Sequence, residues 1–169
     1  GKEGLAEELF ETEIKNLEGI SDQKDTGKTV AFFYITSKGS VNVRKPGDYV
    51  AKMIQMAGGT YVPQNAEEEE NALSTMNMEM EAFYDQAKDA DYIIYNSTID
   101  GELSVLKELL AKSPLLADFK AVKEGHVWCT GKNLFQETMG LGNMIQDIHK
   151  MLTEEEPDPG QMHYIHQLK

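Results

Sequence analysis

Residues 29–35 have the sequence Thr-Val-Ala-Phe-Phe-Tyr-Ile, a continuous apolar run with polar residues on both sides. A strand with one solvent-exposed face alternates apolar and polar residues, whereas a strand covered on both faces does not. The run therefore predicts a strand buried on both faces of a sheet. Similar apolar runs at residues 61–62, 92–95 and 126–129 predict three further strands.

Amphipathic segments separate these four runs. Apolar side chains recur at helical spacing and predict helices at residues 5–18, 46–57, 78–89, 103–110 and 135–152. Pro46 suits the first turn of the second helix. The helix that contains Leu103 has potential caps in Ser97, Thr98 and Asp100. We expect a short additional helix near residues 160–168.

Strands alternating with helices predict an α/β domain of three layers, with a mostly parallel central sheet and helices on both faces. The length of 169 residues suits one such domain. We expect a separate helix within residues 1–20 and a single α/β lobe over residues 21–169. Ligands of such sheets bind at the carboxyl ends of the strands. That edge corresponds to the loops at residues 34–45, 96–100 and 130–135.

Composition excludes some classes of partner. The chain has 16 basic and 29 acidic residues and a net charge of −13. Nucleic acids and anionic lipids require clustered basic residues, so neither is expected as a partner. Cys129 is the only cysteine, which rules out an intrachain disulfide and a cysteine-rich metal site. No apolar stretch approaches the length of a membrane span.

Motifs for common chemistries are missing. The segment after the first predicted strand has neither of the glycine-rich phosphate-binding spacings, and no Gly-x-Ser-x-Gly elbow occurs. His163 and His166 have a spacing that presents two metal ligands on a helix, but an exposed tail is the simpler interpretation, and we predict no metal site. Methionines at helical spacing indicate core packing, and only Met76, at a loop-to-helix junction, stays open as a ligand contact. No cofactor is predicted.

Five short segments follow one another in a characteristic order. They are Val30-Ala31-Phe32-Phe33, Pro46-Gly47-Asp48-Tyr49-Val50, Met56-Ala57-Gly58-Gly59, Asp89-Ala90-Asp91-Tyr92-Ile93-Ile94 and Phe119-Lys120-Ala121-Val122-Lys123-Glu124-Gly125-His126-Val127-Trp128. This succession resembles the C-terminal lobe of the ABC-transporter substrate-binding proteins for iron chelates and cobalamin. The last segment is similar to that family's Ala-Val-x-x-Gly-x-Val-aromatic sequence.

The resemblance implies a binding protein and not an enzyme. An iron siderophore, haem or a corrinoid would bind between two lobes and be delivered to the permease of an ABC importer. Residues 5–18 would belong to the helix that joins the lobes. The N-terminal lobe and the signal of an extracytoplasmic lipoprotein are then expected outside this chain.

The resemblance also implies site residues in the three loops. The candidates are Tyr34, Ser40, Asn42 and Arg44 in the first loop, Asn96, Ser97 and Thr98 in the second, and Asn133, Leu134 and Phe135 in the third. The guanidinium of Arg44 suits a carboxylate of the chelate, although a solvated arginine is an equal alternative. Ser97 and Thr98 can instead cap the following helix, and Phe135 can belong to the core.

In this family one acidic residue on each lobe meets arginines of the permease. Its position here falls at Glu81, with Glu79 as the alternate, and an exposed glutamate without a role is the competing interpretation. A second functional class also stays open. It is a flavodoxin-like or chelatase-like α/β enzyme domain that acts on a flavin or a tetrapyrrole. The exposed face of residues 5–18 can pair with a second copy in a homodimer.

Overall fold

The computed structural model describes residues 8–9, 12, 24–64, 75–131 and 141–169. Most of the helix expected at residues 5–18, and the domain boundary near residue 20, lie outside these residues. So do the three candidates Asn133, Leu134 and Phe135.

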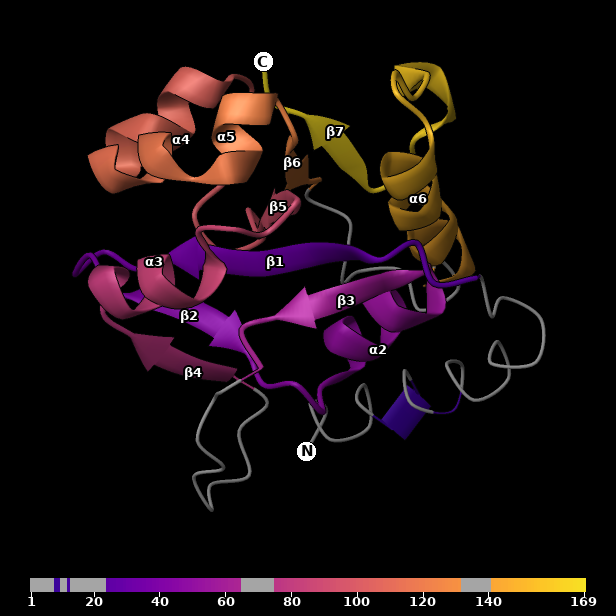
Figure 1. Ribbon diagram of the computed structural model, residues 1–169, viewed down its shortest axis with the longest axis horizontal. Coiled ribbons are helices and arrows are strands. Elements are labelled where there is room, and N and C mark those ends of the chain that lie inside the picture. The colour runs from indigo at the N-terminus through magenta and orange to yellow at the C-terminus, as the bar shows by residue number, and fades with distance from the viewer. Residues whose placement is uncertain (1–7, 10–11, 13–23, 65–74, 132–140) are drawn as a thin grey trace.

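The described residues form a central seven-stranded sheet in the order β4-β2-β1-β5-β6-β7, with β3 paired to the first half of β1 (Figure 1). The strands are β1 Lys28–Ile35, β2 Val41–Arg44, β3 Gly59–Val62, β4 Thr75–Met78, β5 Tyr92–Tyr95, β6 Val127–Thr130 and β7 Ile165–Gln167. β3, β1, β5 and β6 are parallel, and they are the four strands that the apolar runs predict. The expected α/β fold with a mostly parallel sheet is confirmed.

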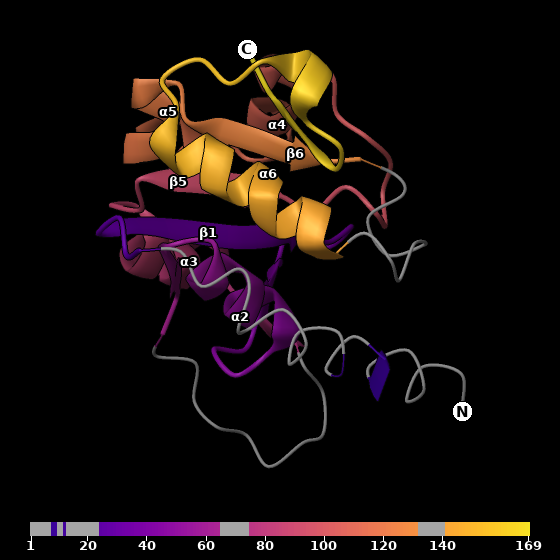
Figure 2. The same cartoon turned by 90° about the vertical axis from the view of Figure 1, so that its right-hand side faces the viewer.

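Helices cover both faces of the sheet. They are α2 Tyr49–Met56, α3 Met80–Ala87, α4 Leu106–Lys112, α5 Lys120–Glu124 and α6 Leu141–Thr153, with short 3-10 helices η1 Pro114–Asp118 and η3 Pro159–Gln161. α2 and α6 pack on one face, and α3, α4 and α5 pack on the other (Figure 2). Along β1, Val30 and Phe32 face the first layer while Ala31 and Phe33 face the second. This two-sided burial explains the uninterrupted apolar sequence of β1.

Three additional strands lengthen the sheet with antiparallel pairings. β2 pairs with β1 and with β4, and β7 pairs with β6. The prediction that residues 34–45 form a loop is therefore wrong, because Phe33, Tyr34 and Ile35 pair with residues 41–43 in a hairpin. The predicted start of a helix at Met78 is also wrong. Met78 pairs with Val41 in β4, and α3 begins at Met80.

Two expectations about helix ends and the tail are wrong as well. α4 begins at Leu106, and its N-cap is Val105, which provides no capping side chain. Ser97, Thr98 and Asp100 lie too early in the chain to cap it. The helix expected at residues 160–168 is replaced by η3 and β7, because pairing with β6 buries Ile165 in the core beside α6.

Asp48, and not Pro46, starts α2. Its carboxylate accepts a hydrogen bond from the backbone N–H of Val50 at 3.1 Å and caps the helix. Pro46 and Gly47 form the turn before this cap. The helix ends at Met56, and Gly58, two residues later, has a φ of +98° that suits only glycine and redirects the chain into β3.

Candidate functional site

The parallel strands β1, β5 and β6 end at the same level. Phe33 pairs with Tyr95, and Tyr95 pairs with Cys129, so Thr36, Asn96 and Gly131 follow at one edge of the sheet. The beginning of the first predicted loop and the second loop therefore lie at this carboxyl edge. For the third loop, only the residues up to Gly131 are described.

Buried hydrogen bonds between Ser97 and Thr130 connect the loop after β5 with the end of β6. The backbone N–H of Ser97 donates to Oγ1 of Thr130 at 2.9 Å, and the hydroxyl of Ser97 donates to the Thr130 carbonyl. Both residues are shielded from solvent, with exposed fractions of 1% and 0%. Sequence reasoning missed Thr130. The available signal was a polar residue that directly follows an apolar strand.

Asn96 and Thr98 hold the loop after β5. The side-chain oxygen of Asn96 accepts hydrogen bonds from the backbone N–H of Thr98 at 3.2 Å and from its hydroxyl at 2.7 Å. The backbone N–H of Asn96 donates to the carbonyl of Phe33 at 2.7 Å. Asn96 and Ser97 are buried, whereas Thr98 is half-buried and has access to the edge. As ligand contacts, all three stay predictions.

The candidates of the first loop lie on the β1–β2 hairpin. Tyr34 and Asn42 are paired across the two strands, and both are half-buried. The side-chain amide of Asn42 donates to Asn77 of β4 at 2.8 Å. Ser40 lies in the turn, where its hydroxyl is 2.8 Å from that of Thr36. The structure therefore brings Tyr34, Ser40 and Asn42 together near the carboxyl edge.

Arg44 is placed differently. Because β2 runs antiparallel to β1, Arg44 lies at the end of β2 that is farther from the carboxyl edge. Its Nε is 3.7 Å from a carboxylate oxygen of Asp48, and its guanidinium lies 5.3 Å from the centre of the Tyr49 ring. The side chain is only 13% exposed. Arg44 thus stabilises the start of α2, and its role toward a chelate stays a prediction.

Glu79 and Glu81 lie at the start of α3. Glu79 occupies the N-cap position without a side-chain capping bond, and Glu81 lies in the first turn. Both side chains are exposed. An acidic side chain in this position is favoured by the positive end of the helix dipole, so the exposed carboxylates need no ion pair within this chain.

Met76 and the two tail histidines are explained by the fold. Met76 lies within β4 opposite Val43 and packs against the core, so its expected position at a loop-to-helix junction is wrong. Neither histidine lies on a helix: His163 lies in a bend before β7, and His166 lies within β7. His163 contacts Asp147, and His166 contacts the carbonyl of Leu103 at 2.6 Å. Among the described residues, no group of three or more potential ligands could hold a metal ion.

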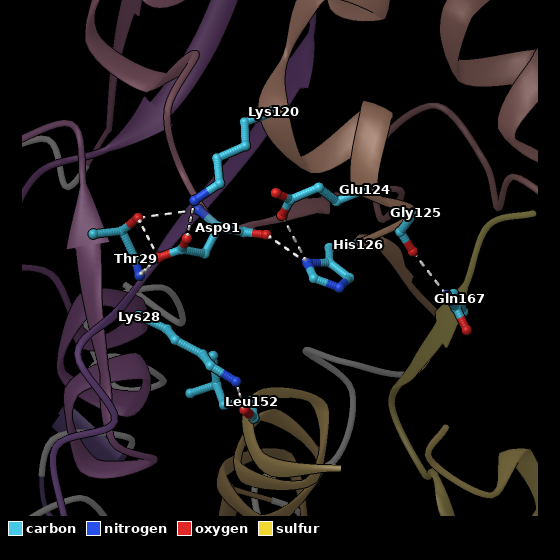
Figure 3. Close-up of polar contacts among 9 residues, drawn as sticks. All are labelled: Lys28, Thr29, Asp91, Lys120, Glu124, Gly125, His126, Leu152 and Gln167. Atoms are coloured by element: carbon cyan, nitrogen blue, oxygen red, sulfur yellow. Dashed lines mark hydrogen bonds and ion pairs between the residues drawn. The ribbon is translucent and has the colours of Figure 1, made fainter. Parts of the chain in front are cut away.

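A second polar cluster lies at the amino ends of the strands, opposite the candidate edge (Figure 3). One carboxylate oxygen of Asp91 accepts from the backbone N–H of Thr29 at 2.9 Å, and the other accepts from Lys120 at 2.6 Å. The carbonyl of Asp91 is 3.1 Å from Nδ1 of His126, whose ring stacks on Tyr92 at 4.5 Å.

The electrostatics of this cluster favour an ionised Asp91. Partial burial raises the pKa of Asp91, but the hydrogen bonds and the charge of Lys120 and the hydrogen bonds of Thr29 outweigh this effect and hold it below its ordinary value. Lys120 has a raised pKa because of the same hydrogen bond. The cluster joins β1, β5 and α5, and we interpret it as structural.

No family model and no curated protein matches this sequence. Solved structures do match. The TroA-like periplasmic binding protein FepB from Veillonella parvula has 12% identity and a TM-score of 0.61 over 98% of this chain. The periplasmic haem-binding protein HutB of Vibrio cholerae has 16% identity and a TM-score of 0.60 over 85%, and a siderophore periplasmic binding protein of Thermobifida fusca has 15% and 0.58 over 88%. The chain shares their fold.

This chain matches 56%, 53% and 52% of those three proteins, respectively, and so spans about half of their length. That share is consistent with one lobe of a two-lobed binding protein, as the sequence resemblance implies. No helix in the described part of the chain has the length and apolar character that crossing a membrane requires.

Proposed function

We propose that this chain is the C-terminal lobe of an extracytoplasmic solute-binding protein that delivers an iron siderophore or haem to an ABC importer. The observation that supports this proposal best is the structural match of the chain to about half the length of two proteins, one described as a haem-binding protein and one as a siderophore-binding protein. A corrinoid is a further candidate ligand. In the full-length protein, a lipid anchor would hold the receptor at the membrane.

The carboxyl edge of the sheet is the proposed ligand surface. Tyr34, Ser40, Asn42 and Thr98 have partly accessible hydroxyl or amide groups there, which suit the oxygen-rich periphery of a chelate. Asn96 and Ser97 are buried and hold the loops that carry the accessible groups. We include Asn133, Leu134 and Phe135 as contacts because the sequence resemblance implies them and because they follow Gly131 in the chain.

The proposed mechanism is closure of two lobes on the ligand, without a chemical step on this chain. One lobe covers only part of the ligand, so apolar and polar contacts reach full strength when the second lobe excludes water. The exposed carboxylates of Glu81 and Glu79 would then meet basic side chains of the permease. Charge pairs of this kind mainly accelerate association and select the partner.

Direct titration tests the ligand class. The probes are haemin, a ferric hydroxamate, a ferric catecholate and cobalamin, followed by absorbance and by the fluorescence of the single tryptophan, Trp128. We expect saturable binding of at least one iron ligand. Asn42→Ala and Tyr34→Phe should weaken it by up to about tenfold, the value of one hydrogen bond. Lys123→Gln, an exposed change in α5 before the amino end of β6, should leave it unchanged.

The same experiment distinguishes the competing class. Absence of binding by this chain, and by a form that carries the N-terminal lobe, would overturn the proposal. A flavin absorption band in the purified protein would instead favour the α/β enzyme alternative, since a solute-binding lobe needs no bound flavin. The absorption spectrum before ligand addition shows whether flavin is bound, and the spectrum after ligand addition shows whether the ligand binds.

A further inference from the structure

The ammonium group of Lys112 lies beside the carboxyl edge of the sheet. Its Nζ is 5.7 Å from the centre of the Tyr95 ring, and Tyr95 is the last residue of β5. The hydroxyl of Tyr95 accepts a hydrogen bond from the backbone N–H of Ile35, the last residue of β1, at 3.4 Å. The ring therefore lies where two parallel strands end, and Lys112 places a positive charge next to it.

The direction of α4 explains this position. The N–H of Leu106, the first residue of α4, donates to the carbonyl of Lys169 at 3.1 Å. The neighbouring Leu168 donates to the carbonyl of Val127, the first residue of β6, so this part of the tail lies at the amino ends of the parallel strands. Lys112 is the last residue of α4, about 9 Å further along the helix axis. The helix thus carries Lys112 away from the amino edge and toward the ligand edge.

The charge of Lys112 is not neutralised within the described part of the chain. Lys112 is exposed and forms no ion pair with another described residue. Asp100 is the acidic residue of the neighbouring loop, and its charge is one of the smaller effects that raise the pKa of Tyr95. Lys38, in the turn of the β1–β2 hairpin, is a second exposed cation at this edge. Two lysines against one aspartate distinguish the described edge from a chain whose net charge is −13.

The Tyr95 ring also fixes the position of the ammonium group. Tyr95 is fully buried, whereas Lys112 is exposed. This combination is typical of a lysine whose aliphatic stem covers an apolar surface while its ammonium stays in water. Cation–π attraction holds the ammonium near the ring. A charge that is already held in place loses less conformational entropy when it binds a ligand.

We propose that Lys112 binds an anionic oxygen at the periphery of the ligand, so that the ligand belongs to the anionic class of iron chelates. This inference rests on the proposed function and deepens it by naming the charge of the ligand. Haem, through its propionates, and a ferric tricatecholate carry such oxygens, whereas a simple ferric trihydroxamate is neutral. The sequence suggested Arg44 for a contact of this kind. Arg44 contacts Asp48 and Tyr49 at the other end of β2, and Lys112 lies at the edge where the ligand is proposed to bind.

Titration calorimetry with haemin, a ferric tricatecholate and a neutral ferric trihydroxamate tests the proposal. Lys112→Met removes the charge and keeps an unbranched side chain that can cover Tyr95. It should weaken the binding of the two anionic probes by about three- to tenfold, because a charge-assisted hydrogen bond at a solvated edge is partly screened. The affinity for the trihydroxamate should not change. Lys112→Arg keeps the charge and should restore the affinity for the anionic probes to within about twofold of the wild type.

Lys107→Met is the matched control. Lys107 is also an exposed lysine of α4, but it lies in the first turn, at the end nearer the amino edge. Its substitution should leave all affinities unchanged, and thermal unfolding checks that both methionine variants keep the fold. Salt provides a second test that needs no variant. Raising the NaCl concentration should weaken the binding of the anionic probes to the wild type and should leave the neutral probe unaffected.

The outcomes separate this inference from the proposed function. If none of the probes binds this chain or a form that carries the N-terminal lobe, the proposed function fails and the inference fails with it. If the anionic probes bind and Lys112→Met leaves their affinity unchanged, or lowers the affinity for the neutral probe equally, the inference alone is overturned. Binding of the neutral trihydroxamate alone, or binding of the anionic probes that does not depend on salt, also overturns it.

Discussion

At the scale of single residues, Asp91 holds the starts of two strands and a helix. We predict that Asp91→Asn lowers the free energy of unfolding at pH 7 by about 1–2 kcal/mol, because it weakens the hydrogen bonds to Thr29 and Lys120. The pKa of Asp91 is lowered in the folded protein. Its stabilisation is therefore complete above the unfolded pKa near 3.9 and is lost as the pH falls through the folded value.

Urea unfolding at pH 7 and pH 3 measures this difference. The difference in the free energy of unfolding between the wild type and Asp91→Asn should be larger at pH 7 than at pH 3. Lys120→Met is the control, since it leaves the bonds from Thr29 to the carboxylate in place and should cost less. An equal gap at both pH values would show that the charge of Asp91 does not contribute.

Gly58 provides a second test at this scale. Its φ is +98°, and a Cβ at this position would lie 2.6 Å from the carbonyl oxygen of Lys24. Gly58→Ala should therefore cost about 2–3 kcal/mol through strain and displacement of the backbone. Gly125 has a φ of +76° but open space around it, so Gly125→Ala should cost only about 1 kcal/mol. Thermal unfolding of the two variants decides whether the contact with Lys24 matters.

At the scale of elements, the hydrogen bonds between Ser97 and Thr130 connect two loops of the proposed ligand edge. Thr130→Val keeps the shape of the side chain but leaves the buried N–H of Ser97 without its acceptor. We expect a loss of about 1–3 kcal/mol in stability. Thr98→Val, which removes a half-buried hydroxyl, should cost less. The ligand titration should include the same two variants. Thr130→Val should bind the ligand more weakly, because Thr130 no longer holds the loop after β5 in place.

The elements also show what the sequence can predict. β1, β5 and β6 are buried on both faces, and such strands have uninterrupted apolar runs that differ from any helix or loop in this chain. The carboxyl edge follows from their parallel order. Tyr34 and Asn42, candidates of the first predicted loop, pair with each other in the β1–β2 hairpin, and their contact with a ligand stays a prediction.

The strands that escaped prediction are short and depend on distant partners. β2 has only Val41 and Val43 as buried residues, and β4 contains Met76 and Met78 between polar residues. Four residues are too few to separate strand from helix by periodicity. Their extended backbone is stabilised by pairing across more than thirty positions of sequence, which no local pattern records. β7 was mistaken for a helix for the same reason.

At the scale of the whole molecule, the raised pKa values of two side chains, His166 and Tyr95, make stability fall on the alkaline side. The pKa of His166 is raised from 6.5 to about 9, chiefly by its hydrogen bond with Cys129. The pKa of Tyr95 is raised from 10.0 to about 12 by burial. A raised folded pKa gives stability that is present below the unfolded value and is lost as the pH rises to the folded value.

We therefore predict a loss of stability in two stages, first between about pH 6.5 and 9 and then between about pH 10 and 12. His166 is half-buried, so solvent screening limits the first stage to about 1 kcal/mol. His166→Gln should remove the first stage and keep the second, whereas Tyr95→Phe should reduce only the second. Urea unfolding across this pH range measures both. A first stage that persists in His166→Gln would assign it to another group and would contradict a stabilising role of protonated His166, whose ring contacts the carbonyl of Leu103.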